Sequence, residues 1–295
     1  MWLIFTIITI FLWGGADVFY KIGSNEKDKY SHLKITIFVG LAMGIHAVLF
    51  LLFTGTRYEL INIIRYLPVS LLYILSMIIG YVGLRYIKLS IVSPIGNSSG
   101  AVAFILCYIF LDEKMTLLQI SAVTIILFGI FFLAVIHKKT DKVAVVNEED
   151  NKRYRSSALA ILFPIFYCFI DGIGTFTDAL ILNRVMNEDQ ALISYEMTFF
   201  VVAVVMLIFL LVIKRQRINV FQQKEPLAAA ILETSGQFFY IRAMAANAVL
   251  AVPIVACYSI ASILLSRIFL KEKLIYKQYL IIAAVVIAVG ILGIE

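Results

Sequence analysis

Five carboxylic acids of this 295-residue chain lie within long apolar stretches, where ionisable side chains are rare. They are Asp17, Asp171, Asp178, Glu196 and Glu233. A charge at the centre of a membrane helix costs about 2.5 to 3.5 kcal/mol on insertion scales, so it needs a partner, water or a proton. We therefore expect these side chains to face the inside of a helix bundle, where they could bind a cationic ligand or exchange a proton.

Helical spacing groups these acids with polar and aromatic neighbours, because residues three, four and seven positions apart share one face. The stripes are Trp13, Gly14, Asp17, Tyr20 and Lys21; Asp171, Gly174, Thr175 and Asp178; and Glu233, Gly236, Gln237 and Tyr240. Each stripe combines a carboxylate with a small residue and a polar or aromatic one, as expected for the lining of a polar cavity. The structural alternative is a carboxylate that only bonds a neighbouring helix, such as Asp17 paired with Lys21.

A further apolar stretch contains Asn97, a polar residue that we expect to line the cavity. Gly96 and Gly100 in the same stretch predict close helix packing. Aromatic rings could attract an ammonium group. Arg85, Arg242 and Lys21 lie near the ends of apolar stretches, so the interior is predicted to be acidic. The predicted substrate-binding residues are Trp13, Asp17, Tyr81, Asn97, Asp171, Asp178, Tyr195, Glu196, Glu233, Gln237, Tyr240 and Tyr258.

The elements that must position these residues are transmembrane helices. Apolar residues make up 62% of the chain and charged residues 15%, and the mean hydropathy is +0.97. About 20 apolar residues span a bilayer as a helix, and runs that are apolar on every face exclude a barrel. The ten predicted spans are Trp2 to Ile22, Leu33 to Phe53, Leu67 to Ile87, Leu89 to Leu111, Leu117 to His137, Ala158 to Leu182, Gln190 to Ile213, Leu227 to Ala246, Val249 to Leu270 and Tyr276 to Ile294.

The second half of the chain repeats the first at an offset of 159 residues. Ser93-Pro94, Phe110-Leu111-Asp112-Glu113-Lys114 and Gln119 are followed in the same order by Val252-Pro253, Phe269-Leu270-Lys271-Glu272-Lys273 and Gln278. Five spans per half is an odd number, so the second copy must enter the membrane in the opposite sense. The sequence predicts an all-α integral membrane protein with an inverted 5+5 repeat: residues 1–137, a polar linker at 138–157, and residues 158–295.

These repeated motifs resemble the EamA-like branch of the drug/metabolite transporter superfamily. The resemblance is good over the third to fifth and the eighth to tenth spans and loose over the others. It implies ten helices with inverted pseudo-symmetry, a central cavity and alternating access for small metabolites. Several relatives of this type have cytoplasmic termini.

The net charge of +6 comes from lysines and arginines in the loops beside the spans, which is a topology signal rather than a nucleic-acid-binding face. The basic loops are residues 21–34, the linker and residues 214–224, which fall on one side. The positive-inside rule then places both termini outside, contrary to the resemblance. The first apolar segment has no charged n-region or cleavage site, so we expect a retained helix rather than a signal peptide.

Other chemistry has little support in the sequence. We find no Gly-rich phosphate loop and no His-Glu-x-x-His motif. Cys107, Cys168 and Cys257 lie within spans as packing residues, and we expect no metal, cofactor or enzyme activity. The predicted function is a secondary active transporter of the cell membrane, moving an amine- or amino-acid-like metabolite through an acidic and aromatic cavity, with proton coupling left open. The alternatives are a passive channel or membrane receptor and, with less support, a lipid-modifying membrane enzyme.

Overall fold

The computed structural model describes residues 1–24, 28–111, 115–141, 160–216, 218, 223–271 and 275–294. The repeated turns at 112–114 and 272–274 and most of the predicted linker lie outside these residues. The helices are α1 (Trp2–Gly23), α2 (Ser31–Thr54), α3 (Ile61–Leu84), α4 (Leu89–Asn97), α5 (Ser99–Phe110), α6 (Leu117–Asp141), α8 (Leu162–Arg184), α9 (Glu188–Ile208) with its π-helical extension η1 (Phe209–Ile213), α10 (Lys224–Val255), α11 (Tyr258–Phe269) and α12 (Tyr276–Ile294).

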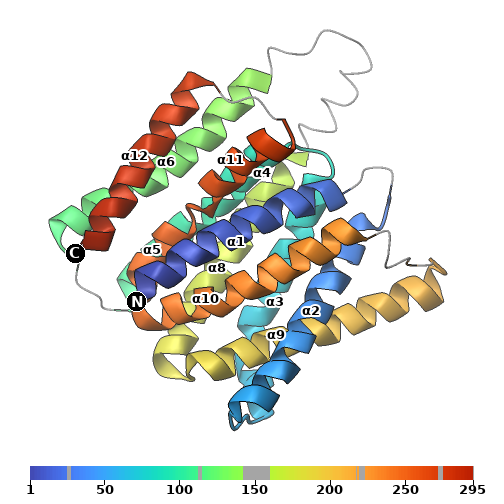
Figure 1. Cartoon of the computed structure of the whole chain (residues 1–295). Coiled ribbons are helices and arrows are strands. Elements are labelled where there is room, and N and C mark those ends of the chain that lie inside the picture. Colours follow the sequence, from blue (N-terminus) through green and yellow to red (C-terminus); the bar gives the residue numbers. More distant parts are fainter. Residues whose placement is uncertain are drawn as a thin grey trace, which may run out of the picture.

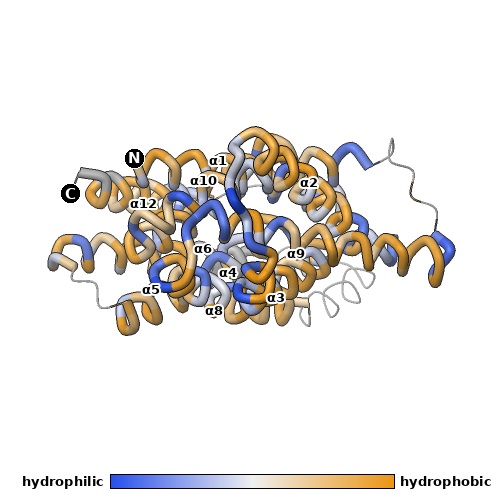
Figure 2. Tube along the Cα trace, turned by 90° about the horizontal axis from the view of Figure 1, so that it is seen from below, coloured by the Kyte–Doolittle hydropathy of each residue, from blue (hydrophilic) through white to orange (hydrophobic). Residues whose placement is uncertain are grey.

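The described residues form helices and no strands, and most helices carry large apolar side chains on their outer faces. Among the described residues, seven helical segments are long and apolar enough to cross a membrane, and shorter apolar helices occur at Leu117–Phe132, Tyr258–Phe269 and Tyr276–Val289. Figure 2 shows hydrophobic residues along most of the tube, with hydrophilic segments between them. The chain is therefore an all-helical membrane protein, as the composition predicts.

Two spans predicted as continuous helices are interrupted, which corrects the sequence interpretation. Ser98 separates α4 from α5, and Ala256 and Cys257 separate α10 from α11. Ser98 follows Pro94 by four residues and Cys257 follows Pro253 by four, and proline removes a backbone donor from the helix. Both contain a tighter i to i−3 bond, from the Ala101 N–H to the Ser98 carbonyl at 3.0 Å and from the Ile260 N–H to the Cys257 carbonyl at 2.8 Å. These two turns lie 159 positions apart, so the interruption is part of the repeat.

The predicted boundary between the eighth and ninth spans lies inside the segment labelled α10. Asn247 has non-helical backbone angles (φ −163°, ψ 88°), and its side-chain oxygen accepts the Leu250 N–H at 3.1 Å. Asparagine is a preferred N-cap because it satisfies such an unpaired donor. Asn247 therefore ends one helix and begins the next. The third span begins earlier than predicted, at Ile61 rather than Leu67.

Helices of the two halves pack against one another in matching pairs (Figure 1). α2 packs on α9 and α6 on α12, which are helices at equivalent places in the two copies. The contact of α1 with α10 is matched by that of α8 with α3, and the contact of α1 with α11 by that of α8 with α5. Figure 1 shows α6 and α12 together on one side of the bundle, with α2 and α9 on the other.

Two close helix contacts occur at nearly equivalent positions of the copies. A Cβ added to Gly14 on α1 would lie 2.6 Å from the Cβ of Ala261 on α11. A Cβ added to Gly172 on α8 would lie 2.7 Å from the Cβ of Val102 on α5. Val102 and Ala261 are 159 residues apart, so both copies use a glycine to bring a long helix onto a half-helix.

Candidate functional site

A cavity of about 110 Å³ lies in the middle of the bundle and is lined by α1, α3, α4, α5, α8, α9, α10 and α11. A single water needs roughly 10 to 15 Å³ of such space, so the cavity is large enough for a small molecule. The interrupted helices meet it, since Asn97, Ser99, Ala256 and Tyr258 belong to its wall. Three carboxylates also line it, namely Asp17, Asp171 and Glu233.

Asp17 is held by hydroxyl groups from both halves. Its Oδ2 accepts hydrogen bonds from Ser93 at 2.8 Å and from Ser262 at 2.7 Å. The Asn97 amide nitrogen donates to the Ser93 hydroxyl at 3.1 Å, which extends the chain of bonds along α4. Lys21 donates to the carbonyls of Leu84 and Ile87, at 2.5 and 2.8 Å. The Leu84 carbonyl is at the end of α3, where carbonyls have no partner within the helix, and Ile87 follows in the connection to α4.

Asp171 is held in a similar way in the second half. Ser99 donates to its Oδ2 at 2.8 Å and Ser76 to its Oδ1 at 3.3 Å. Ser99 is the first residue of α5, so the carboxylate lies beside a helix N-terminus, where the helix dipole favours a negative charge. Both oxygens of Asp171 therefore have protein partners.

Glu233 has fewer partners than the two aspartates. Among the described residues its carboxylate accepts one hydrogen bond, from the Tyr20 hydroxyl at 3.2 Å. The side chain is nevertheless buried, with a relative exposure of 8%. A buried carboxylate with free lone pairs is expensive unless a ligand, water or proton satisfies it. Glu233 is thus the carboxylate of the cavity best placed to receive a ligand cation.

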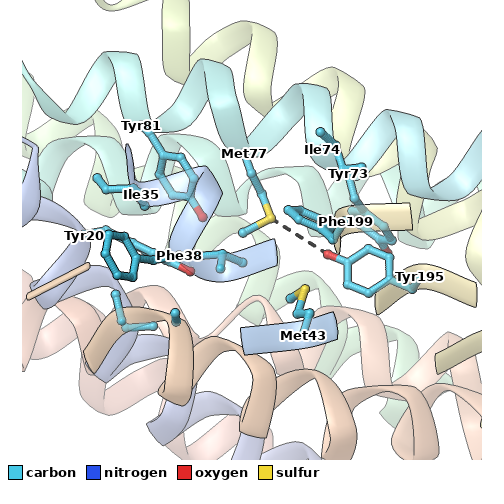
Figure 3. Close-up of a cluster of buried hydrophobic side chains, with 14 of the residues drawn as sticks. Tyr20, Ile35, Phe38, Met43, Tyr73, Ile74, Met77, Tyr81, Tyr195 and Phe199 are labelled. Atoms are coloured by element: carbon cyan, nitrogen blue, oxygen red, sulfur yellow. Dashed lines mark hydrogen bonds between the residues drawn. The ribbon is translucent and has the colours of Figure 1, made fainter. Parts of the chain in front are cut away.

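Aromatic side chains form the walls around these acids. The ring of Trp13 lies 4.9 Å from that of Tyr240 and 5.6 Å from that of Tyr258, measured between centroids. In Figure 3, Tyr20 and Tyr81 lie on one side of Met77, and Tyr73 and Tyr195 on the other. The Tyr195 hydroxyl points at the Met77 sulfur, at 3.8 Å. Such rings present negative faces to a bound cation.

Tyr167 reaches the cavity through a slot between two glycines. A Cβ on Gly80 would come within 2.9 Å of its ring and a Cβ on Gly96 within 3.0 Å. The Tyr167 hydroxyl then lies 3.4 Å from that of Tyr258. Gly96 therefore accommodates an aromatic ring rather than a helix backbone, whereas Gly100 packs against Ala256 as the small-residue pattern predicts.

Beyond the cavity, polar side chains join the two halves along the N-terminal part of α3. The Tyr73 hydroxyl bonds those of Tyr240 and Thr175, at 2.9 and 3.1 Å. Two helical turns before Tyr73 on α3, the Tyr66 hydroxyl donates to Asp178 at 2.5 Å. Bonds of the same kind follow from Asn62 to Gln190 and between Tyr58 and Ser194, both at 2.8 Å. Tyr73 lines the cavity but Tyr66 and Asn62 do not, so these bonds join the two halves beyond the lining of the cavity.

The structure brings ten of the twelve predicted site residues to the cavity wall. Asp178 and Glu196 lie outside the lining. Asp178 is buried behind Tyr73 and bonds Tyr66. Glu196 lies on the part of α9 that faces α2, where His46 Nδ1 is 2.8 Å from both of its oxygens. Spacing along α9 could not reveal which neighbour each face meets.

Tyr20 lines the cavity, as its predicted stripe implies, although it was not among the predicted substrate-binding residues. Three further lining residues important for its shape were not predicted, namely Tyr73, Met77 and Tyr167. A signal was present for all three. Tyr73, Met77 and Tyr81 recur at intervals of four, so they share one face of α3. Tyr167 precedes Asp171 by four and extends the stripe on α8.

An ion pair joins Asp28, in the connection between α1 and α2, to Lys34 in the first turn of α2. Lys34 Nζ lies 2.6 Å from Asp28 Oδ2, and the Tyr30 N–H donates to Asp28 Oδ1 at 3.0 Å. Burial raises the pKa of Asp28, but these two hydrogen bonds and the charges of Lys34 and Arg85 outweigh it. The pKa of this carboxyl therefore lies below its ordinary value of 3.8.

Comparisons with known proteins bear on the first half and on the fold. Residues 1–135 match the family described as "EamA-like transporter family", which is part of the drug/metabolite transporter superfamily. A solved structure titled "Crystal structure of protein" matches with a TM-score of 0.66 at 11% identity, over 99% of this chain and 96% of that chain. The comparison with curated proteins gave no match. The family match confirms the resemblance predicted from the sequence, and the structural match shows the fold.

Proposed function

We propose that this chain, an EamA-like member of the drug/metabolite transporter superfamily by the match of its first half, is a secondary active transporter of a small polar organic metabolite. The observation that carries the proposal is the central cavity, walled by both halves and lined by three carboxylates and several aromatic rings. The cargo is amine- or amino-acid-like because carboxylates and aromatic faces both attract ammonium groups. The transporter would act in the cell membrane.

The arrangement of helices supports ten spans in an inverted 5+5 repeat. The pairing of α1 with α10 and of α8 with α3 is the pattern that a twofold relation between the copies would give. Interrupted helices at the same place in each copy add to this support, because transporters commonly build their sites from such helices. Alternating access would then be a rocking of one half against the other around the cavity.

The bonds between the halves beyond Tyr73 suggest which contacts must change during transport. Tyr66 to Asp178 and Asn62 to Gln190 join the copies at one end of the cavity. Opening this end would break these bonds, and closing the opposite end would have to supply comparable contacts. Each neutral bond contributes about 1 kcal/mol and one to a charged group about 1.5 to 3 kcal/mol, which suits a reversible gate.

Proton coupling is proposed at Glu233, because this carboxylate has the fewest partners among the three in the wall. A proton could neutralise it when no cargo is bound, and a cationic cargo would favour the charged form. Glu233→Gln is nearly isosteric and removes the charge. We expect it to fold normally and to lose either cargo binding or the pH dependence of transport.

The test is transport by purified protein in proteoliposomes. Thermal-shift screening against amino acids, polyamines, quaternary amines and nucleosides first identifies ligands, since a ligand of the folded state raises its apparent stability. Uptake of a hit should saturate and should be accelerated by the same compound on the opposite side. Flux that neither saturates nor shows counter-transport would favour a passive channel, and binding without flux would favour a receptor.

A further inference from the structure

A second group of ionisable side chains lies away from the cavity, where α2, α9 and α10 meet. The Glu196 carboxylate on α9 is fully buried, and its hydrogen-bond partner among the described residues is His46 on α2. Arg242 on α10 donates to Asp189 on α9 at 3.1 Å. All four residues lie outside the lining of the cavity, so they have no part in the site described above.

Two aromatic rings bring the histidine and the arginine into one environment. The Arg242 guanidinium lies 3.8 Å from the ring centroid of Phe238 and 5.9 Å from that of Phe50. The His46 ring lies 5.8 and 6.1 Å from the same two centroids. Among the described residues, the charged groups that face His46 are Glu196 on α9 and Arg242 on α10, while α1 and α3, which also pack against α2, contribute none.

The bond from His46 to Glu196 crosses between the two halves at the end where the gate is proposed. α2 belongs to the first half and α9 to the second, and both lie on the same side of the bundle (Figure 1). Glu196 follows Gln190 by six residues on α9, and Gln190 bonds Asn62 in the proposed gate. Asp189, in the first turn of α9, has a side chain that is 37% exposed, so the cluster reaches the surface of the bundle at this end.

The number of protons on this pair sets the charge beside Arg242. An imidazolium and a carboxylate are neutral together, and their charge-assisted bond is roughly twice as strong as a neutral one. Loss of the imidazolium proton still leaves an N–H donor at Nδ1 and a negative charge, which Arg242 offsets. One further proton on the carboxylate instead removes the charged acceptor and leaves a net positive charge beside the guanidinium. Because like charges repel strongly away from water, this protonation pushes α2 away from α10.

We propose that His46 and Glu196 form a pH-sensitive switch, which holds the two halves together at the proposed gate and releases them when a further proton binds from the surface at that end. The proposal rests on the proposed transport function, because the gate belongs to it. The switch is separate from Glu233, since it binds no cargo and exchanges no proton with it. It sets how readily one end of the bundle opens.

The experiment measures this opening without cargo and without flux. Spin labels are attached at Phe53→Cys, in the last turn of α2, and at Val185→Cys, between α8 and α9, after Cys107, Cys168 and Cys257 have been replaced by alanine. Both labelled positions are exposed, at 84% and 53%. Pulsed electron paramagnetic resonance then gives the distance between the halves at about pH 8 and about pH 5.5, on either side of the ordinary titration of histidine. We expect the population with the longer distance to rise roughly fivefold or more at the lower pH.

Two variants should shift this distance in opposite directions. His46→Asn keeps a donor near the position of Nδ1 but cannot be protonated, so it should keep the shorter distance at both pH values. Glu196→Gln has a neutral side chain at every pH and should raise the population with the longer distance already at about pH 8. Loss of folding cannot produce both results. His32→Asn is the matched control, because His32 lies in the first turn of α2, beside Arg85 and Asp28, and should respond to pH as the unmodified protein does.

The proposal is overturned if the distance does not change with pH, if His46→Asn responds like the unmodified protein, or if Glu196→Gln keeps the shorter distance at the higher pH. A response lost in His32→Asn as well would also overturn it. The proposed function fails in a different way. Lack of saturable counter-transport, with the pH-dependent distance intact, would reject the carrier and keep the switch, whereas normal counter-transport without a change in distance would keep the carrier and reject the switch.

Discussion

Replacing Gly236 by alanine tests whether the close contact of α1 with α10 positions Trp13 in the cavity. A Cβ at position 236 would lie 2.5 Å from Trp13 Nε1 and still closer to Cδ1. The indole must therefore move, and it would lose its hydrogen bond to the Glu233 carbonyl, which measures 3.3 Å. The change acts on the site through a ring that is not itself mutated.

The expected loss of stability follows from three contributions. Overpacking of a well-packed contact costs about 1 to 3 kcal/mol. The lost hydrogen bond costs about 1 kcal/mol, and the better helix propensity of alanine returns about the same amount. The net loss is about 1 to 3 kcal/mol, which should lower the unfolding midpoint by several degrees.

The assay combines thermal unfolding in detergent with the fluorescence emission of Trp13. The emission is measured in a Trp2→Phe background, because Trp2 and Trp13 are the two tryptophans of the chain. Gly15→Ala is the matched control on the same pair of helices, because its new Cβ would meet only the end of the flexible Leu232 side chain, at 3.2 Å. We expect the control to be neutral or slightly stabilising and to leave the emission unchanged. Equal midpoints for the two variants, with unchanged Trp13 emission in Gly236→Ala, would refute the reasoning.

Three further predictions concern the gate, a surface ion pair and topology. Tyr66→Phe removes the bond to buried Asp178 and should destabilise the proposed gate by about 1.5 to 3 kcal/mol, so cysteine-accessibility labelling near Asn62 should increase. Unchanged labelling would mean that this bond does not hold the gate closed. Because the pKa of Asp28 is depressed in the folded state, its pairing with Lys34 stabilises the protein above the unfolded pKa near 3.8 and ceases to do so as the pH falls through the folded value. Lys34→Met should therefore lower the free energy of unfolding slightly at pH 7, by at most about 1 kcal/mol, and should have no effect well below pH 3.8. A difference between the variant and the unmodified protein that does not depend on pH would contradict this account. If the basic loops are cytoplasmic, a reporter fused after Glu295 should be external, and a cytoplasmic reporter would show that the charge rule fails here.

The sequence by itself determined the class of the protein and much of its site. Long apolar runs require helices in a membrane, because lipid cannot satisfy exposed backbone groups. The spacing of 159 between Pro94 and Pro253 revealed the repeat, and the helical interval from Glu233 to Gln237 placed both on one face. These features are local, so they can be read without knowing which helices are neighbours.

Tertiary structure decided which faces meet. Glu196 and Glu233 look alike in the sequence, since both lie within long apolar stretches. Packing directs Glu196 to His46 between α2 and α9, and Glu233 to the cavity beside Tyr20. Likewise, only the packed helices show that the Gln237 amide nitrogen has no hydrogen-bond partner among the described residues. The physical reason is that helical periodicity fixes the relative direction of side chains within one helix, whereas their partners depend on the rotation of that helix against the others.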